Sequence, residues 1–154
     1  MNITTNLFGE VEVDESKIIC FAQGIIGFPD LKRFMLIHDV EDEDKKISWL
    51  QSVDEPGFAL PVIDPLVIDE GYNPEIEDEL LAPLNIEDAS QILVVTTITV
   101  PSDITKMTAN FKAPMIINAA NLKAAQIIVE DEKYIVKYPI YDILKGNKEG
   151  DGIC

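Results

Sequence analysis

The stretch WLQSVDEPGFALPVIDP at residues 49–65 decides the fold of this chain. Its middle, SVDEPG at residues 52–57, separates two apolar runs. Pro56 presets its own backbone φ angle and Gly57 tolerates a positive φ, and this combination is typical of a turn. The stretch is therefore predicted to be a hairpin.

The two arms of this hairpin are expected at residues 47–51 and 58–63, as neighbouring antiparallel strands. Asp64 and Pro65 end the second arm, because proline cannot donate a backbone hydrogen bond within a sheet. Trp49 is the only tryptophan of the chain and is expected to anchor the core. No catalytic residue set is visible here, so we interpret the hairpin as framework.

Further strands are predicted on both sides of the hairpin, where short β-branched and aromatic runs are separated by turn residues. The clearest is QILVVTTITV at residues 91–100, which Pro101 ends. Short strands at such close spacing predict a mainly β, single-domain, antiparallel β-barrel-like fold. The other expected strands are 2–6, 9–13, 17–22, 34–38, 66–68 as an extension of the sheet, 108–111, 115–118, and 123–129 with 134–140 as a hairpin.

Two short helices are predicted as an insertion around residues 74–89. Asn73 is the candidate N-cap of the first, Pro74 suits its first position, and the carboxylates that follow complement its positive end. Pro83 is expected to end this helix, and Asn85 to begin the second.

Two boundaries complete this organisation. The barrel-like domain is expected to span residues 1–144. Residues 145–154 are rich in glycine and charge, and they are predicted to form a flexible C-terminal tail.

The chain is strongly acidic, with 12 Lys and Arg against 28 Asp and Glu and a formal net charge of −16. Residues 47–105 contain 12 of the acids and no Lys or Arg. Such a charge repels nucleic acids and anionic membranes and attracts basic proteins, so neither nucleic acid nor membrane is an expected direct partner. A solubilising surface and a partner-binding acidic face both remain open as interpretations.

Catalysis is not expected. His38, the only histidine, adjoins Asp39, and Ser48 and Ser52 lie on the next predicted strand, so a Ser–His–Asp arrangement can be drawn. Nothing in the sequence marks a buried orienting acid or an oxyanion hole, which such a triad needs. We therefore interpret His38 as a polar residue at a strand end, and the protein as no enzyme.

No metal or cofactor is expected either. One histidine and two distant cysteines supply no ligand cluster, and residues 39–50 lack the glycine and glutamate of a calcium loop. Gly24 and Gly27 lack the rest of a phosphate-binding loop. Cys20 lies in an apolar run and is expected to behave as a small buried hydrophobe.

The expected compartment is the cytoplasm. The N-terminus has neither the basic region nor the apolar region of a signal peptide. The sequence also contains no apolar run of 18 residues, so no transmembrane helix is predicted.

Seven short motifs, taken together and in order, resemble the flagellar assembly factor FliW family. Singly they are hydrophobic framework, but the resemblance covers residues 1 to about 141 without large gaps. The motifs are FAQGIIGF (21–28), FMLI (34–37), WLQS (49–52), FALPVIDP (58–65), ILVVT (92–96), APMIIN (113–118) and QII (126–128).

This resemblance implies a small, cytoplasmic, β-barrel-like protein without enzymatic activity. Members of the family bind flagellin and, when flagellin is scarce, the RNA-binding translational regulator CsrA. The binding relieves CsrA repression of flagellin mRNA translation, and the family is understood to act allosterically. The acidic charge agrees with this, because CsrA must be basic where it holds RNA.

We place the CsrA contact, as a hypothesis, in the acidic insertion that follows Pro65. The missing cations and the interrupted strand pattern motivate this placement, and apolar anchors would supply much of the binding energy. For flagellin, an exposed edge strand is an option, without a particular strand being singled out. A generic acidic chaperone or nucleic-acid mimic is the alternative function. The candidate partner-binding residues are Asp69, Glu70, Tyr72, Glu75, Ile76, Glu77 and Asp78.

Overall fold

A computed structural model describes residues 2–38 and 47–144 of the protein. Its central hairpin joins β5 (Ile47–Ser52) to β6 (Ala59–Ile63), which pair antiparallel as the sequence predicts. The turn between them is held from inside, because the buried Gln51 amide donates to the carbonyl oxygens of Ser52, Pro56 and Phe58 at 3.0, 3.0 and 3.1 Å.

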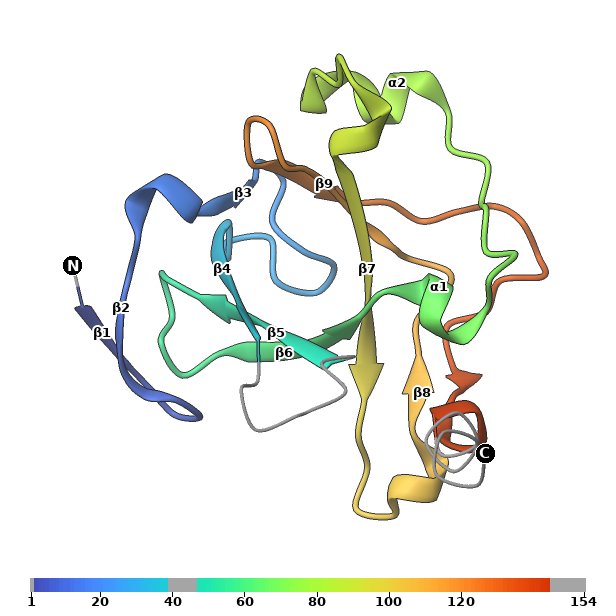
Figure 1. Ribbon diagram of the computed structural model, residues 1–154, viewed down its shortest axis with the longest axis horizontal. Helices are drawn as coiled ribbons and strands as arrows, with labels where there is room; N and C mark the ends of the chain where they lie inside the picture. Colours follow the sequence, from blue (N-terminus) through green and yellow to red (C-terminus); the bar gives the residue numbers. More distant parts are fainter. Residues whose placement is uncertain (1, 39–46, 145–154) are drawn as a thin grey trace, which may run out of the picture.

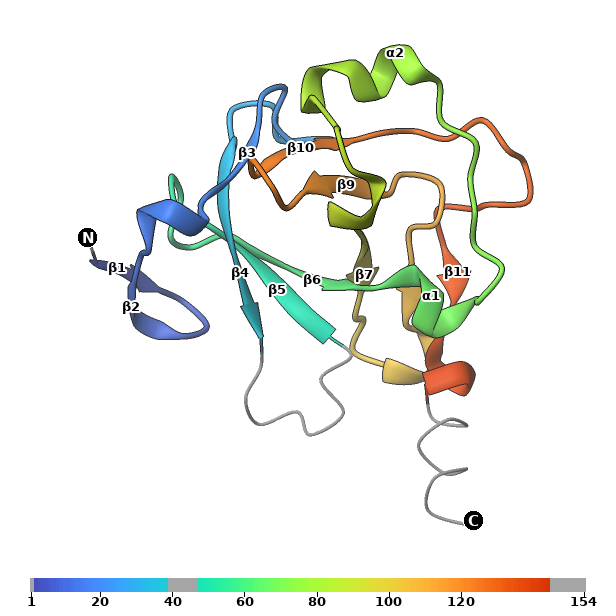
Figure 2. The ribbon, with the colours of Figure 1, turned by 45° about the horizontal axis from the view of Figure 1, so that its top comes forward.

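Seven strands, two of them those of this hairpin, close into a barrel (Figures 1 and 2). The barrel closes because β9 pairs with β7 as well as with β10. Every pair is antiparallel except β3 with β10, so the predicted mainly β, antiparallel barrel-like fold is confirmed with one parallel exception. In order around the barrel the strands are β7 (Ile92–Thr99), β6, β5, β4 (Arg33–His38), β3 (Ile19–Phe21), β10 (Lys123–Gln126) and β9 (Met115–Asn118).

Four further strands lie beside the barrel. β1 (Asn2–Thr5) and β2 (Gly9–Glu12) form the predicted N-terminal hairpin, at one side of the molecule in Figure 1. β8 (Thr108–Ala109) pairs antiparallel with the C-terminal end of β7, and β11 (Tyr138–Pro139) pairs in turn with β8. The predicted hairpin of 123–129 with 134–140 is therefore wrong. β10 pairs with β3 and β9, whereas β11 pairs with β8.

The first helix lies where an extension of the sheet was predicted. Residues 66–68 belong to α1 (Pro65–Ile68). The Asp64 carboxylate caps this helix by accepting from the Leu66 N–H at 2.9 Å, and proline occupies the first helical turn. A cap and a proline thus override the β-branched residues that suggested a strand.

The predicted helical insertion exists, but it begins later and is shorter than expected. α2 (Asp78–Leu81) follows Glu77 and continues into the 3-10 helix η2 (Ala82–Leu84), so Asn73 is not its N-cap. Pro83 lies inside η2, and Asn85 ends that helix with a positive φ of 50°. The remaining 3-10 helices are η1 (Glu15–Lys17), η3 (Ala89–Gln91), which Asp88 caps, and η4 (Ile104–Lys106).

Two core predictions are wrong. Trp49 is only half-buried and faces the N-terminal hairpin, where its ring meets the Phe8 ring edge-on at 6.0 Å. Cys20 is exposed, because its neighbours Ile19 and Phe21 point into the core and side chains alternate along a strand.

The core itself has two main clusters. One fills the barrel around Phe21, Phe34 and Leu50. The other lies under α1 and the adjoining loops, around Tyr72 and Phe111. No helix within the described ranges is long and apolar enough to cross a membrane. The domain span of 1–144 stays a prediction, and the predicted tail at 145–154 lies outside the described residues.

Candidate functional site

The predicted contact residues lie on residues 69–81, which we name the ridge. The ridge leads from α1 to the end of α2 and runs beside β7, to its right in Figure 1. Its acidic side chains are exposed at Glu70, Glu75, Glu77 and Asp78. Asp69 is half-buried, and its carboxylate accepts from the Gly71 N–H at 2.9 Å. With Glu79, which is also exposed, the ridge therefore presents five carboxylates to solvent.

Two tyrosines fix the beginning of the ridge. Tyr72 is 7% exposed, and its hydroxyl donates to the Phe111 carbonyl oxygen at 2.9 Å. Burial raises the pKa of this hydroxyl well above its usual value. The hydroxyl of Tyr134 accepts from the Asn73 N–H at 2.8 Å, and the Tyr72 and Tyr134 rings lie 4.6 Å apart.

This burial changes the role of one predicted anchor. Tyr72 serves the core, so little of its side chain is available to a partner. Ile76 is half-buried and lies between the two grooves described below, so it is the better candidate for an apolar contact.

Two asparagines, which the sequence interpretation missed, hold the far end. The side-chain amides of Asn118 and Asn121 donate to the Leu84 carbonyl oxygen at 3.0 and 2.9 Å. Leu84 itself packs against Ile116 and Ile127. No role was predicted for either asparagine, although an asparagine at the end of an apolar strand is a signal for such capping contacts.

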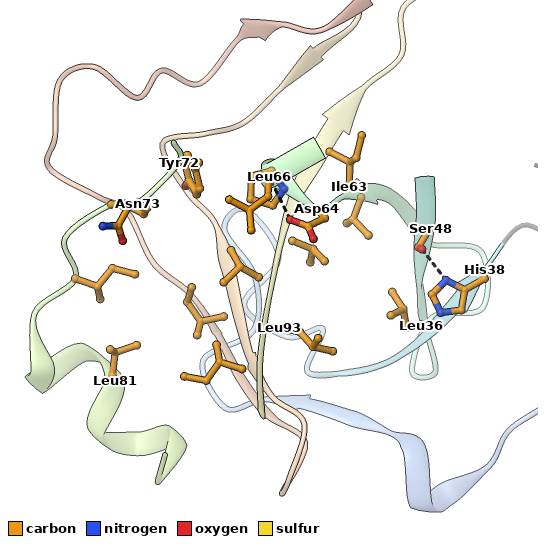
Figure 3. A pocket seen from close by; sticks show the side chains of 18 residues that line it. Leu36, His38, Ser48, Ile63, Asp64, Leu66, Tyr72, Asn73, Leu81 and Leu93 are labelled. Atoms are coloured by element: carbon orange, nitrogen blue, oxygen red, sulfur yellow. Dashed lines mark hydrogen bonds between the residues drawn. The ribbon is translucent and has the colours of Figure 1, made fainter. Parts of the chain in front are cut away.

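An apolar groove of about 670 Å³ lies on one side of the ridge. Figure 3 shows Asn73 and Leu81 on one wall, His38 and Ser48 on the other, and Leu93 between them. Leu93 and Leu66 are 47% and 49% exposed, so the groove offers apolar surface to solvent. None of its described lining residues is Lys or Arg. Its other lining residues are Leu36, Val62, Ile63, Asp64, Pro65, Tyr72, Pro74, Ile76, Ile92, Val94, Val95 and Ile116.

The histidine of this groove forms a simple polar pair. His38 Nδ1 lies 2.8 Å from Ser48 Oγ, and the histidine is exposed at the end of β4 (Figure 3). Asp39, the third member of the imagined triad, lies outside the described residues. The predicted place of His38 at a strand end is confirmed, and the absence of catalysis stays a prediction.

A second groove, also of about 670 Å³, lies on the other side of the ridge. We name it the acidic groove, because Glu75 and Glu77 line it from the ridge and Glu130 and Asp131 line it from the opposite side. Lys133 approaches Asp131 at 3.8 Å with both side chains exposed, a weak pairing in solvent. The other lining residues are apolar: Ile76, Leu80, Ile127, Ile128 and Val129.

Neither groove has the composition of a metal centre. Over residues 2–38 and 47–144, no group of three or more His, Cys, Asp and Glu side chains is placed to hold a metal ion. What the grooves combine is apolar surface with carboxylates, and this combination suits the binding of protein segments.

Comparison with known proteins defines the class. The model of the FliW protein family matches residues 2–140. A flagellar assembly factor FliW of Lachnoclostridium phytofermentans is 51% identical, with all of both chains covered. One of Caldanaerobacter subterraneus is 43% identical over 94% of this chain and 96% of the relative.

A solved structure agrees with the sequence relatives. A crystal structure of the flagellar assembly factor FliW superimposes with a TM-score of 0.83 at 29% identity, covering 92% of this chain and 97% of that one. The shared architecture is thus that of a flagellar assembly factor. This chain belongs to the FliW family.

Proposed function

We propose that this protein is a cytoplasmic, non-enzymatic partner switch that binds flagellin and antagonises CsrA, so that repression of flagellin mRNA translation is relieved. Its relatives are named flagellar assembly factors, which supports a role in building the flagellum. The observation that carries the CsrA part is the ridge, whose exposed carboxylates stand in a 59-residue region, 47–105, without any Lys or Arg.

The ridge is proposed as the CsrA contact for an electrostatic reason. A protein that holds RNA needs a basic surface, and complementary charge raises the rate of encounter and fixes orientation. The candidate contacts are Asp69, Glu70, Glu75, Glu77 and Asp78, with Ile76 as the apolar anchor and Tyr72 as its buried support.

Charge reversal tests this placement. We expect the triple variant E75K/E77K/D78K to bind CsrA at least about tenfold more weakly in calorimetry at physiological salt, which corresponds to about 1.4 kcal/mol. The matched control E12K/E15K/D30K changes the net charge equally at exposed acids away from the ridge. Equal loss in both variants, or in neither, would show that the ridge is not the contact.

The apolar groove is proposed as the flagellin contact. A subunit that has not yet assembled exposes apolar surface that it later buries in the filament, and an exposed apolar groove is a suitable receptor for it. L66D/L93D should therefore weaken flagellin binding, whereas V100D/I104D places the same charges on exposed apolar residues outside the groove. Similar effects of the two variants would refute this assignment.

A generic acidic chaperone or nucleic-acid mimic is the second candidate, and the net charge of −16 favours it. Such a protein would capture many basic proteins, and the capture would fall steeply with salt. A pulldown from a motile cell's lysate at low and physiological salt separates the two functions, because only the partner switch retains flagellin and CsrA selectively at physiological salt.

A further inference from the structure

We propose that residues 126–130 are an open strand edge on which the basic partner docks, by laying an extended segment of its own chain into the acidic groove. This proposal rests on the proposed function and specifies how CsrA is held. It follows from three observations: the backbone pairing of these residues, the alternation of their side chains, and the charge on both walls of the groove.

The backbone of this segment is paired on one side only. The N–H groups of Ile127 and Val129 donate to the carbonyl oxygens of Pro114 and Lys112 at 3.0 and 2.8 Å. In an extended chain the next residue turns its N–H and C=O to the opposite side. Ile128 follows this rule, and within the described parts of the chain nothing hydrogen-bonds to its backbone.

The neighbour that would cover this edge stops short of it. Strand β3 pairs with Lys123 and Ala124 at the start of β10, and no further along. At Gln126 the side chain still accepts from the Ile26 N–H at 2.8 Å. From Ile127 onward the facing element is the ridge, and the acidic groove separates the two. Figures 1 and 2 both show the segment between α1 and α2 crossing the chain that follows β10. The edge therefore opens into a groove.

The side chains alternate as a strand requires. Ile127 and Val129 are buried in the core, whereas Ile128 is 60% exposed. Leu80 on the opposite wall is 47% exposed. An added strand would thus gain backbone hydrogen bonds from Ile128 and apolar contact with both side chains, which is the usual arrangement of strand addition.

The charged side chains of the acidic groove indicate which kind of partner fits it. Glu75 and Glu77 make the ridge wall of the groove negative. Glu130 and Asp131 add carboxylates to the other wall, where Lys133 and Lys112 approach Asp131. An inserted segment with basic residues between apolar ones satisfies both kinds of surface. A second copy of this chain is disfavoured, because each copy carries a net charge of −16. The basic regulator of the proposed function is therefore the occupant to which we commit.

Hydrogen exchange at single amides tests the docking mode directly on the wild-type protein. The Ile128 amide should exchange freely in the unbound protein and at least about tenfold more slowly when CsrA is bound. The amides of Ile127 and Val129 are already hydrogen-bonded and should change much less. Full binding of CsrA without protection at Ile128 would overturn the proposal.

Two variants give an independent test. I128P removes the N–H that the partner would use, and this N–H has no partner inside the described protein. I128A keeps the N–H and removes only apolar surface. We expect CsrA affinity to fall at least about tenfold in I128P and less than about threefold in I128A, with both variants folded by circular dichroism.

The outcomes separate this proposal from the function on which it rests. If I128P binds CsrA like the wild type, strand docking is wrong and the proposed function stands. If wild-type protein binds no CsrA at all, the proposed function itself fails. Concentration-dependent dimerisation that I128P abolishes would assign the edge to a second copy and so overturn the proposal.

Discussion

Replacing Tyr72 by Phe removes one hydroxyl from the base of the ridge and should alter stability in a pH-dependent way. At pH 8 the variant leaves the Phe111 carbonyl oxygen without its hydrogen bond. Loss of one such bond costs about 1 kcal/mol. For a chain of 154 residues this lowers the unfolding midpoint by about 3 °C.

The stability difference between the two proteins should close and then reverse in strongly basic solution. Burial raises the pKa of Tyr72 in the folded protein, whereas the unfolded tyrosine titrates at about 10. The stability that comes from this group is therefore complete below about pH 10 and is lost as the pH rises above it. At pH 11 the wild type should have lost about 1.4 kcal/mol through Tyr72, a loss that the phenylalanine variant cannot suffer.

Urea unfolding followed by far-UV circular dichroism, at pH 8 and pH 11, measures both free energies. The wild type should be more stable than Y72F by about 1 kcal/mol at pH 8 and less stable than it by about 0.4 kcal/mol at pH 11. The control I98V alters a buried side chain that does not titrate, so its deficit should be the same at both pH values. A constant deficit for Y72F as well would refute the reasoning.

Three further perturbations have definite expected outcomes. G24A should lower the free energy of unfolding in urea by more than about 2 kcal/mol, because Gly24 has a φ of +70° and the new Cβ would lie 2.4 Å from a backbone carbonyl oxygen. The control G27A should lower it by only about 1 kcal/mol, because Gly27 has a φ of +87° but open space around the new Cβ. The Arg33 guanidinium donates to the Asp54 carboxylate at 2.6 Å and holds the pKa of that carboxyl below its usual range. D54N should therefore be less stable than the wild type by about 0.5 kcal/mol at pH 7. This gap should close as the pH falls below about 3.9 and through the lowered pKa, and equal gaps at pH 7 and pH 2.5 would contradict it. N118A should lose about 1–3 kcal/mol, because it removes the donation to the Asn85 carbonyl oxygen and one of the two donations to the Leu84 carbonyl oxygen, which keeps only that of Asn121. Amide exchange in α2 should accelerate, and unchanged exchange would show that Asn118 does not hold this end of the ridge.

The framework could be predicted from the sequence because its signals are local. The turn at 52–57 and the strand β7 are each specified by residues within ten positions of one another, so β5, β6 and β7 lie where expected. The barrel followed from their number and spacing. Local signals of this kind survive folding unless a distant contact opposes them.

The ridge shows such a contact. Asn73 has the type and spacing of an N-cap, but its N–H donates to the Tyr134 hydroxyl, 61 residues away. The helix consequently begins at Asp78. The same distance in sequence explains why the pairing of β10 and β11 was missed, since nothing within either segment tells which strand it will join.

The acidic groove contains carboxylates that could be predicted from composition and carboxylates that could not. The carboxylates of Glu75 and Glu77 were visible as a region without cations, and they lie on the surface as expected. Glu130 and Asp131 come from residues 106–154, where 7 Lys outnumber 6 acids, so composition did not mark them. Folding places these two carboxylates across the groove from the first two, beside an open backbone edge.

The ridge lies between the two grooves that we propose for the two partners. Ile76 lines both grooves, so the two sites have separate walls but share this residue and the chain that carries it. The ridge is fixed at its ends, by Tyr134 near its beginning and by Asn118 beyond its end, and it carries exposed carboxylates between them. In the proposed binding modes, a segment in the acidic groove and a flagellin segment in the apolar groove would both contact Ile76. Because a packed element has few alternative positions, we expect that filling one groove changes the shape of the other. Two partners can in this way exclude one another without competing for the same surface.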